Sequence, residues 1–559
     1  MTITGRSSAT HDVFNQVPPL AGHDVSADEA LLTAIAAHGG DWVLPELRVL
    51  GRAAGSPEVI EQARLANEHS PVLRTHDRAG NRIDEAEFHP AWHQLMAAAV
   101  SHGLHAAPWA SARPGAHLAR AAKFYVWTQA EAGHGCPISM TYAVVPSLRH
   151  EPALAGRFEP LLAAPVYDPG LRVPESKRGL LAGMAMTEKQ GGSDVRANTT
   201  TAEPAGDGSY LITGHKWFCS APMCDLFLIL AKAPGGLTCF LLPRVLPDGS
   251  RNQMRIQRLK DKLGNRSNAS SEVEYHDAVA WPVGEQGRGI ATIIEMVSST
   301  RLDCVLGSAA SIRQACVEAT HHSAHREAFG RKLLDQPAMA AVLADLTLES
   351  QAATTLAMRL AAAADLAARG DGNEAALLRV LLPAAKHWVC KRAPAVIGEA
   401  LECLGGNGYV EESVLPRLYR DAPLNSIWEG SGNVTALDLL RALARSEAGI
   451  DALRDELAQA AAEDPRLDQA VRVLWRELGE AAADPARGPA VARRLAGLLT
   501  VTVQAALLVR YAPAAVSDAF CASRLTPGPL GGPGVSFGTL PAGLDLKAIL
   551  ARSRPVVTG

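Results

Sequence analysis

The chain has 559 residues, of which 47% are hydrophobic and 20% charged, and its formal net charge is −4. This length exceeds one ordinary hydrophobic core, so we expect two to four domains, and the composition excludes a disordered chain. The small negative charge excludes a general electrostatic attraction to nucleic acid, so any such attraction has to be local.

The nine cysteines are scattered along the chain and form no C-x-x-C pair. This pattern argues against a disulfide framework or a zinc site and is typical of reduced thiols in a cytosol. Charged residues interrupt the alanine-rich segments before they reach the ~18 apolar residues of a membrane span. The N-terminal segment also lacks the apolar stretch of a secretory signal. We therefore expect a soluble cytoplasmic protein without a membrane partner.

Along the chain, apolar residues first recur at helical spacing, for example at residues 92–101 and 116–131. They predict an N-terminal helical domain over residues 1–180. Short apolar or alternating runs between Gly- and Pro-containing turns then predict an all-β domain over residues 181–290.

The helical period returns after the β region. Long alanine-rich segments such as residues 352–369 are typical of a tightly packed bundle. We predict a helical bundle over residues 291–445 and an additional C-terminal helical domain over residues 446–559.

Two segments of the β region could contact a flat ligand. The paired glycines of residues 185–197 (AMTEKQGGSDVRA) allow a backbone to approach a flat or anionic group, and Thr187 and Ser193 offer hydroxyls. In residues 214–220, Trp217 presents a large face that could lie against another planar ring. Taken alone, an ordinary Gly-Gly turn and a core tryptophan are the commoner explanations.

A basic segment around Arg326 could bind phosphate, because arginine suits bidentate phosphate contacts. The alternative is a solvated helix end with Gly330 as its cap. The neighbouring His321, His322 and His325 have no carboxylate or cysteine at metal-binding spacing, so we expect no metal site.

A glycine cluster at residues 402–409 does not follow a predicted strand, so it fails as a dinucleotide-binding fingerprint, although its bare backbone could approach a ligand or another chain. Glu429 lies between a tryptophan and a glycine. If buried, its pKa would rise and it would become a useful base. The equal alternative is a helix-initiating turn with Ser431 or Asn433 as N-cap and Glu429 in solvent.

The order and spacing of these segments resemble the acyl-CoA dehydrogenase superfamily from about residue 110 to 445, with its two signatures at residues 185–197 and 402–421. The segments TEKQGGSD, KDKLGNRSNAS and PLNSIWEGSGN are most similar to the AidB-type branch of the bacterial adaptive response to DNA alkylation. The resemblance implies an α+β fold with an N-terminal helical domain, a central β-barrel-like domain, a C-terminal four-helix bundle and an extra C-terminal helical domain.

The same resemblance implies FAD between the β domain and the bundle, with Trp217 flanking the isoalloxazine. The implied contacts within one chain are Met186, Thr187, Ser193, Trp217, Phe218, Ser220, Trp428, Ser431 and Asn433. The implied contacts to the FAD of a neighbouring subunit are Arg326, Gln336, Gly405 and Gly406. The protein is therefore expected to be a homo-oligomer, most simply a tetramer.

In this family a glutamate removes the α proton of an acyl thioester while the flavin accepts the β hydride. Two positions for the base are known, and they match Glu429 and Thr300. Because a threonine cannot act as this base, Glu429 is the predicted catalytic residue. The first signature departs from its common form at Lys189 and Gln190.

The branch resemblance also implies poor dehydrogenase activity and binding of double-stranded DNA through the C-terminal domain. Residues 485–559 carry 8 basic and 2 acidic residues, whereas residues 446–484 carry 4 basic and 10 acidic ones. A phosphate-facing surface or a solvated helix face both fit this pattern. The candidate DNA-binding residues are Arg487, Arg493, Arg494 and Arg510.

Two functions follow from these features. The first is an FAD-containing, acyl-CoA dehydrogenase-like oxidoreductase of the alkylation response that binds DNA, protects or repairs it, and retains weak dehydrogenase activity. The alternative is a metabolic acyl-CoA dehydrogenase that acts on a short or branched acyl thioester without binding DNA.

Overall fold

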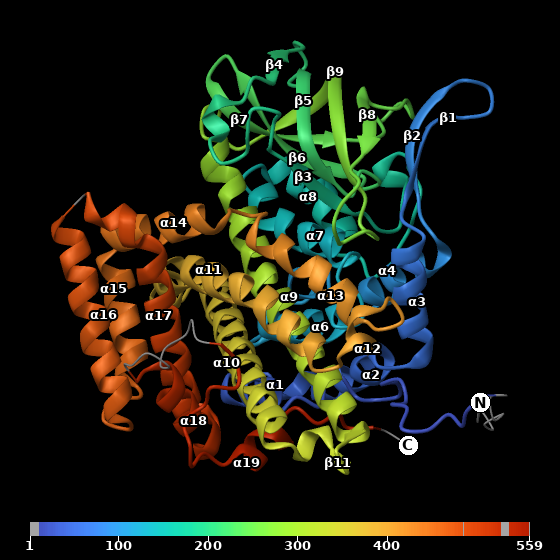
Figure 1. The fold of residues 1–559 in the computed structure, drawn as a ribbon. Helices are drawn as coiled ribbons and strands as arrows, with labels where there is room; N and C mark the ends of the chain where they lie inside the picture. The colour runs from blue at the N-terminus through green and yellow to red at the C-terminus, as the bar shows by residue number, and fades with distance from the viewer. Residues whose placement is uncertain (1–9, 485, 527–535, 558–559) are drawn as a thin grey trace.

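The structure, a computed structural model, describes residues 10–484, 486–526 and 536–557 (Figure 1). Its N-terminal part is helical, as predicted. The helices are α1 (Glu29–Ala37), α2 (Leu44–Ala54), α3 (Pro57–Glu68), α4 (Pro90–Ser101), α5 (Ala107–Ala110), α6 (Ala116–Thr128), α7 (Gly135–Leu148) and α8 (Pro152–Leu162). Between α3 and α4, an antiparallel hairpin of β1 (Val72–His76) and β2 (Arg82–Glu87) projects outward (Figure 1).

The predicted β region forms a closed sheet. Its strands are β3 (Ala182–Ala185), β4 (Thr201–Pro204), β5 (Tyr210–Ser220), β6 (Leu226–Ala233), β7 (Gly236–Pro243), β8 (Met254–Leu259) and β9 (Ser270–Val283). Strand β6 pairs with β7, β7 with β9, β9 with β5, and β5 with β4. Because β4 meets β6 again where Thr201 pairs with Lys232, the strands return to their start and form the expected barrel.

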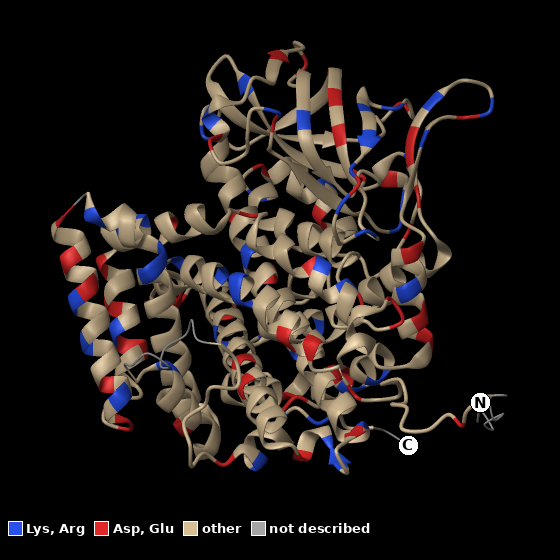
Figure 2. Cartoon of the chain, in the orientation of Figure 1, with Lys and Arg blue, Asp and Glu red and all other residues tan. Residues whose placement is uncertain are grey.

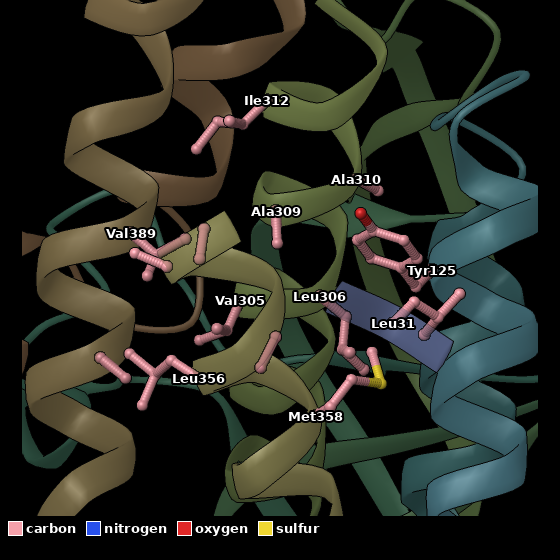
Figure 3. Packing of buried hydrophobic residues seen from close by; sticks show 14 of the residues in the cluster. Leu31, Tyr125, Val305, Leu306, Ala309, Ala310, Ile312, Leu356, Met358 and Val389 are labelled. Carbon is pink, nitrogen blue, oxygen red and sulfur yellow. The ribbon is translucent and has the colours of Figure 1, made fainter. Parts of the chain in front are cut away.

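The bundle packs beneath the barrel. Its long helices are α9 (Gly289–His325), α10 (Pro337–Ala368), α11 (Gly372–Glu402) and α14 (Gly432–Arg445). Figure 3 shows Val305 and Ala309 of α9 packing near Leu356 of α10 and Val389 of α11, all buried. Small alanine side chains let these helices approach closely. The predicted four-helix bundle is confirmed.

Short elements connect the long helices of the bundle. They are β10 (Glu327–Ala328), β11 (Arg331–Lys332), α12 (Gly406–Tyr409), α13 (Leu415–Asp421) and the 3-10 helix η5 (Ala422–Ser426). The hairpin of β10 and β11 follows α9, while α13 and η5 pack on α11 and lead the chain back toward the barrel. These connections place the segment after η5 between the bundle and the barrel.

The extra C-terminal helices follow the bundle. They are α15 (Glu447–Ala458), α16 (Pro465–Ala483), α17 (Arg487–Tyr511), α18 (Ala514–Arg524) and α19 (Leu546–Ala551). Helix α17 is long and apolar enough to span a membrane, but 78% of its most apolar window is buried inside the protein, as in a core helix. It packs on α11, α14 and α16. The sequence after Thr526 is rich in Pro and Gly, and residues 527–535 lie outside the described residues.

Candidate active site

A cavity of about 1070 Å³ lies where the barrel meets the bundle. Its wall comprises the loop after β3, the end of β5, helices α7 and α9, and the turn that precedes α14. Of the ten predicted catalytic and same-chain FAD-binding residues, eight line this one cavity. These are Met186, Thr187, Ser193, Phe218, Ser220, Trp428, Glu429 and Ser431.

The loop after β3 carries the paired glycines. A Cβ atom added to Gly192 would lie only 2.3 Å from the Thr187 hydroxyl, so no larger residue fits at this position. The backbone N–H of Trp217 donates to the carbonyl of Thr187 at 2.8 Å and fixes the loop to β5. The glycine pair therefore lets the loop fold tightly along one side of the cavity.

Trp217, which was predicted to flank the ligand ring, is not among the residues that line the cavity. Phe218 and Ser220 line the cavity, and β5 has an irregular register between Lys216 and Cys219, next to Trp217. Instead, the Lys260 ammonium lies 3.3 Å from the centroid of the Trp217 ring, a cation–π contact. Phe218 is the aromatic residue of this strand that a ligand in the cavity would meet.

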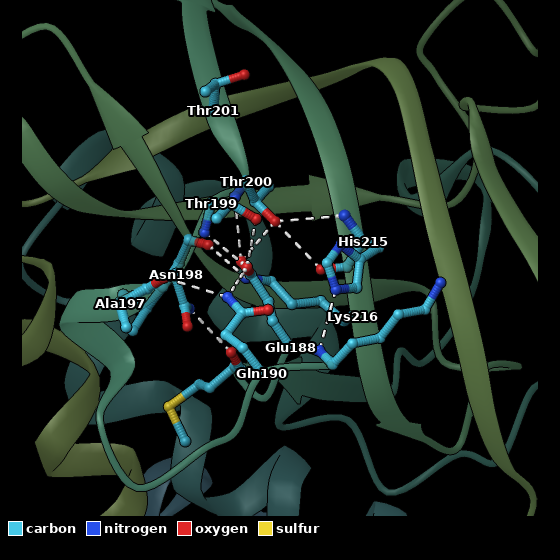
Figure 4. A network of polar contacts seen from close by, with 12 residues as sticks. Glu188, Gln190, Ala197, Asn198, Thr199, Thr200, Thr201, His215 and Lys216 are labelled. Carbon is cyan, nitrogen blue, oxygen red and sulfur yellow. Dashed lines mark hydrogen bonds and ion pairs between the residues drawn. The ribbon is translucent and has the colours of Figure 1, made fainter.

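A buried ion pair that the sequence analysis missed supports the glycine loop (Figure 4). The side chains of Glu188 and Lys216 are both fully buried, with Nζ 2.8 Å from Oε1. Thr199 and Thr200 donate further hydrogen bonds to the Glu188 carboxylate. Burial acts to raise the pKa of Glu188, but the Lys216 ammonium and these donors hold it well below its ordinary value. The pair thus fixes the loop as a rigid, charged unit.

Glu429 occupies the turn between η5 and α14 and has a left-handed backbone, with φ of 56°. Its carboxylate lines the cavity and accepts a hydrogen bond of 2.7 Å from the Thr300 hydroxyl. Burial raises the pKa of Glu429, while the Thr300 hydrogen bond and the charges of Arg301 and Lys386 oppose that rise. Ser431 is indeed the N-cap residue of α14, as one alternative expected, but Glu429 is partly buried and lines the cavity instead of extending into solvent.

Two neighbours of Glu429 differ in their placement. Trp428 lines the cavity, and its indole N–H donates to Asn425 at 2.9 Å. Asn433 is exposed on the first turn of α14 and does not line the cavity. The predicted ligand contact of Asn433 therefore stays a prediction, whereas Trp428 and Ser431 line the cavity.

The residues predicted to contact a neighbouring subunit's FAD lie away from the cavity. Arg326 donates to the carbonyl of Asn15 at 2.6 Å, and Gln336 donates to the carbonyl of Ala328 at 2.9 Å. Gly405 and Gly406 are exposed. None of these four residues lines the wall of the cavity.

A second cavity of about 670 Å³ adjoins the mouth of the first and shares Arg196, Ile290 and Ile294 with it. Lys232 and Arg288 also line this space. Arg196 and Lys232 form no ion pair within the described ranges, and Arg288 reaches only exposed Glu285, at 3.8 Å. We call the group of Arg196, Lys232 and Arg288 the cationic mouth. Sequence reasoning missed it, because these residues are 36 or more positions apart in the chain and come together only when the barrel packs on α9.

The four candidate DNA-binding arginines differ in their surroundings. Arg487 pairs with Glu480 at 2.8 Å and Arg494 with Glu477 at 2.9 Å, and acidic as well as basic residues lie along α16 in Figure 2. Arg510 is partly buried and pairs with Glu456. Arg493 is exposed and has no acidic partner in the part of the chain that the structure describes. Arg493 is therefore the least neutralised of the four.

Three family models match successive parts of the chain. They are the Adaptive response protein AidB N-terminal domain at residues 15–169, the acyl-CoA dehydrogenase middle domain at residues 183–278, and the acyl-CoA dehydrogenase C-terminal domain at residues 287–444. Together they follow the helical, barrel and bundle segments in order.

Individual proteins agree with these matches. AidB of Escherichia coli is 45% identical over 515 residues, which cover 92% of this chain and 94% of AidB. The structure of Caenorhabditis elegans ACDH-11 in complex with C11-CoA superposes with a TM-score of 0.82 at 26% identity, over 100% of this chain and 96% of that one. A Bacillus anthracis acyl-CoA dehydrogenase complexed with FAD has 18% identity, coverages of 77% and 80%, and a TM-score of 0.63, which shows the shared fold. The chain therefore belongs to the acyl-CoA dehydrogenase family of oxidoreductases, in the AidB branch.

Proposed function

We propose that this protein is an FAD-containing dehydrogenase of acyl-CoA thioesters in which Glu429 is the catalytic base. The observation that carries the proposal is the placement of the Glu429 carboxylate in the large cavity, where burial raises its pKa. A carboxylate in such a setting binds a proton more readily than one in water, which is what removal of a carbon-bound proton requires.

The residues of the cavity fit FAD. Phe218 lines the cavity yet is 50% exposed, so a large aromatic face is left for a planar ring to cover. Met186, Thr187, Ser193 and Ser220 surround it with hydroxyl and backbone groups suited to the polar edge of a flavin. Bound there, FAD would supply the acceptor for the β hydride of the substrate.

This chain's own residues would handle the proton. Glu429 would take the α proton onto its carboxylate as the Cα–H bond breaks, and the thioester would leave as the α,β-unsaturated product. The Thr300 hydroxyl holds the carboxylate at 2.7 Å and limits its rotation. A fixed base saves the entropy of orienting the two groups in the transition state.

The remote residues fit the proposed oligomer. Arg326 and Gln336 lie near the hairpin of β10 and β11, whose tip residue Phe329 is 98% exposed. Tyr409, close to the glycine cluster, is 81% exposed. Exposed aromatic side chains of this kind are typical of surfaces that another protein chain buries. We therefore propose that a neighbouring chain packs on these two surfaces and that they bind the adenosine end of its FAD. We further propose that the assembly is a tetramer.

The cationic mouth supports a CoA thioester as the substrate. Arg196, Lys232 and Arg288 gather where the two cavities join, and a CoA nucleotide brings several phosphate charges to that point. The related ACDH-11 was solved in complex with C11-CoA. We therefore propose that the acyl group enters the large cavity while the nucleotide stays at the mouth.

Anaerobic titration of the purified yellow protein with an acyl-CoA and with the matching acyl-pantetheine should test this assignment. Both thioesters should bleach the flavin. Changing Arg196, Lys232 and Arg288 together to Ala should raise the half-saturating concentration of the acyl-CoA by about 10–100-fold, since each exposed contact contributes up to about 1 kcal/mol. The response to the pantetheine thioester, which lacks the nucleotide phosphates, serves as the control. No bleaching by either thioester would refute the dehydrogenase assignment.

A second function is favoured by Arg493, which is exposed and has no acidic partner among the described residues, and by the similarity to AidB. We propose that the C-terminal helices also bind double-stranded DNA in the cytoplasm, and that the protein protects or repairs DNA under alkylating stress. Arg493 and Arg494 are the main candidates for phosphate contacts. Arg487 and Arg494 both have a carboxylate partner, but the Arg487 side chain is 43% exposed against 66% for Arg494, so Arg487 contributes less, and Arg510 contributes least because it is partly buried.

Changing Arg493 and Arg494 together to Ala should weaken binding to duplex DNA for all sequences alike. If both contact phosphates, the slope of log affinity against log salt should flatten by about 2, because each contact releases about 0.9 counterions. Gel shifts or fluorescence anisotropy at several salt concentrations measure both quantities. Arg64→Ala, on distant α3, is the matched control. An unaltered slope of log affinity against log salt would show that Arg493 and Arg494 do not contact DNA phosphates.

A further inference from the structure

Two cationic side chains hold the turn that carries Glu429. They donate hydrogen bonds to three successive backbone carbonyl groups of this turn. The Lys386 ammonium donates to the carbonyls of Trp428 and Gly430 at 2.7 and 2.5 Å. Between them, the Arg301 Nε–H donates to the carbonyl of Glu429 at 2.8 Å. Lys386 comes from α11 and Arg301 from α9, so two helices of the bundle hold one short turn.

We propose that Lys386 is a positioning residue for the base, whose buried ammonium holds the turn so that the Glu429 carboxylate faces the cavity. The inference rests on the proposed role of Glu429 in proton removal. Lys386 does not line the cavity itself, so it acts through the turn and not on the substrate.

The surroundings of Lys386 leave it no other evident partner. Its side chain is on a residue only 1% exposed, and no Asp or Glu within the described ranges pairs with it. A buried ammonium without a carboxylate is unfavourable unless fixed dipoles replace its water. The carbonyls of Trp428 and Gly430 accept hydrogen bonds from Nζ, so the charge and the turn stabilise one another.

The turn needs such support because of its backbone. Glu429 has a φ of 56°, a left-handed conformation that is unfavourable for residues other than glycine. Without the cations, relaxation of this residue to negative φ would swing its side chain out of the cavity. Arg301 is itself anchored, because its Nη1 lies 2.7 Å from Asp438 on α14. Among the described residues, Lys386 has no carboxylate partner of this kind, and its ammonium bonds to the carbonyls of the turn.

The charges that face Glu429 make the role of Lys386 measurable. The charges of Arg301 and Lys386 act on its carboxylate, and both oppose the rise of its pKa. On the facing elements, burial raises the pKa of the Cys136 thiol to about 12 and that of Cys304 well above its usual value, so both stay neutral. His387, beside Lys386, is also neutral, because burial lowers its pKa to about 4. Asp438 is neutralised by Arg301 and Arg379.

Removal of the Lys386 charge should therefore raise the pKa of Glu429 further. Because only the ionised carboxylate accepts the proton, activity is lost as the pH falls through that pKa. The acid limb of the pH–rate profile should then move to higher pH, and kcat at neutral pH should fall while KM changes little. A purely structural lysine would not produce this selective shift.

The test compares Lys386→Met, Lys386→Gln and Lys391→Met as FAD-loaded proteins. Lys386→Met should move the acid limb up by about one pH unit and lower kcat by about 10–100-fold. Lys386→Gln keeps one donor without the charge, so it should shift the limb similarly with a smaller loss of kcat. Lys391 lies on the same helix but makes no hydrogen bond to the turn. The acid limb of the pH–rate profile of Lys391→Met should therefore lie at the same pH as that of the parent protein.

A second readout does not depend on turnover. The protonated carboxyl of Glu429 has an infrared C=O band that Glu429→Gln lacks, and its growth with falling pH reports the pKa directly. In Lys386→Gln this band should appear at higher pH than in the parent. A band and an acid limb identical to the parent in both Lys386 variants would overturn the positioning role. Full turnover by Glu429→Gln would instead overturn the proposed base, which separates the two failures.

Discussion

Glu429→Gln should retain FAD but bleach it with acyl-CoA about 10²–10⁴-fold more slowly than the parent, since this is the usual contribution of a positioned general base. The amide has nearly the shape of the carboxylate, so the cavity and the Thr300 hydrogen bond can persist. What is lost is the capacity to take the α proton. Stopped-flow absorbance of the flavin, mixed anaerobically with acyl-CoA, measures the rate directly.

Two controls sharpen this expectation. Glu412→Gln removes an exposed glutamate that forms no ion pair in the described part of the chain, and its rate should match the parent. In the parent, the acid limb of the rate should lie above the ordinary range of a carboxyl group, because burial raises the pKa of Glu429. If Glu429→Gln bleaches at the parental rate, another residue removes the proton and the assignment fails.

The second large effect concerns stability. Glu188→Gln should lower the free energy of unfolding by about 3–5 kcal/mol, the typical loss when one partner of a buried ion pair is removed. The Lys216 ammonium is fully buried, and its remaining partner would be the carbonyl of Leu230 at 2.8 Å. An uncompensated charge would then remain inside the barrel. Urea unfolding followed by circular dichroism measures the change.

The sign of the pH dependence follows from the same charge. Burial lowers the pKa of Lys216, while Glu188 acts to raise it, so the lysine of Glu188→Gln should deprotonate more easily. The deficit in stability should therefore shrink as the pH rises. The double variant Glu188→Gln with Lys216→Met should recover much of the loss. Glu87→Gln breaks the exposed pair with Arg74 instead and should cost less than about 1 kcal/mol. A comparable loss in Glu87→Gln would contradict the role of burial.

Elements with strong local patterns were predictable. The apolar period at residues 92–101 anticipated α4, and the short apolar runs anticipated β6 and β7, because periodicity directly reflects which face is buried. Ends were less predictable: α6 stops at Thr128, three residues before the end of the periodic segment. The face of Trp217 was also not predictable, since β5 carries a bulge between Lys216 and Cys219 that alters its register against β9.

The buried charges show a different limit. A glutamate and a lysine 28 positions apart are expected to be solvated, and only their mutual pairing inside the barrel makes the burial of Glu188 and Lys216 tolerable. The sequence alone offers no local signal for such a pair. Glu188 lies in the segment TEK and Lys216 in the segment GHK. These segments could have suggested an ion pair only once β5 was known to pack against the glycine loop.

By itself, the sequence determined the family, the order of helical and β segments, and Glu429 as the one candidate base, because signatures and periodicity are properties of contiguous residues. The tertiary structure alone decided what surrounds that base. Lys386 and Arg301 reach its turn from two different helices, and Arg196, Lys232 and Arg288 converge at the mouth of the cavity. These effects depend on distances through space and on burial, which a linear chain does not specify until its barrel and bundle have packed together.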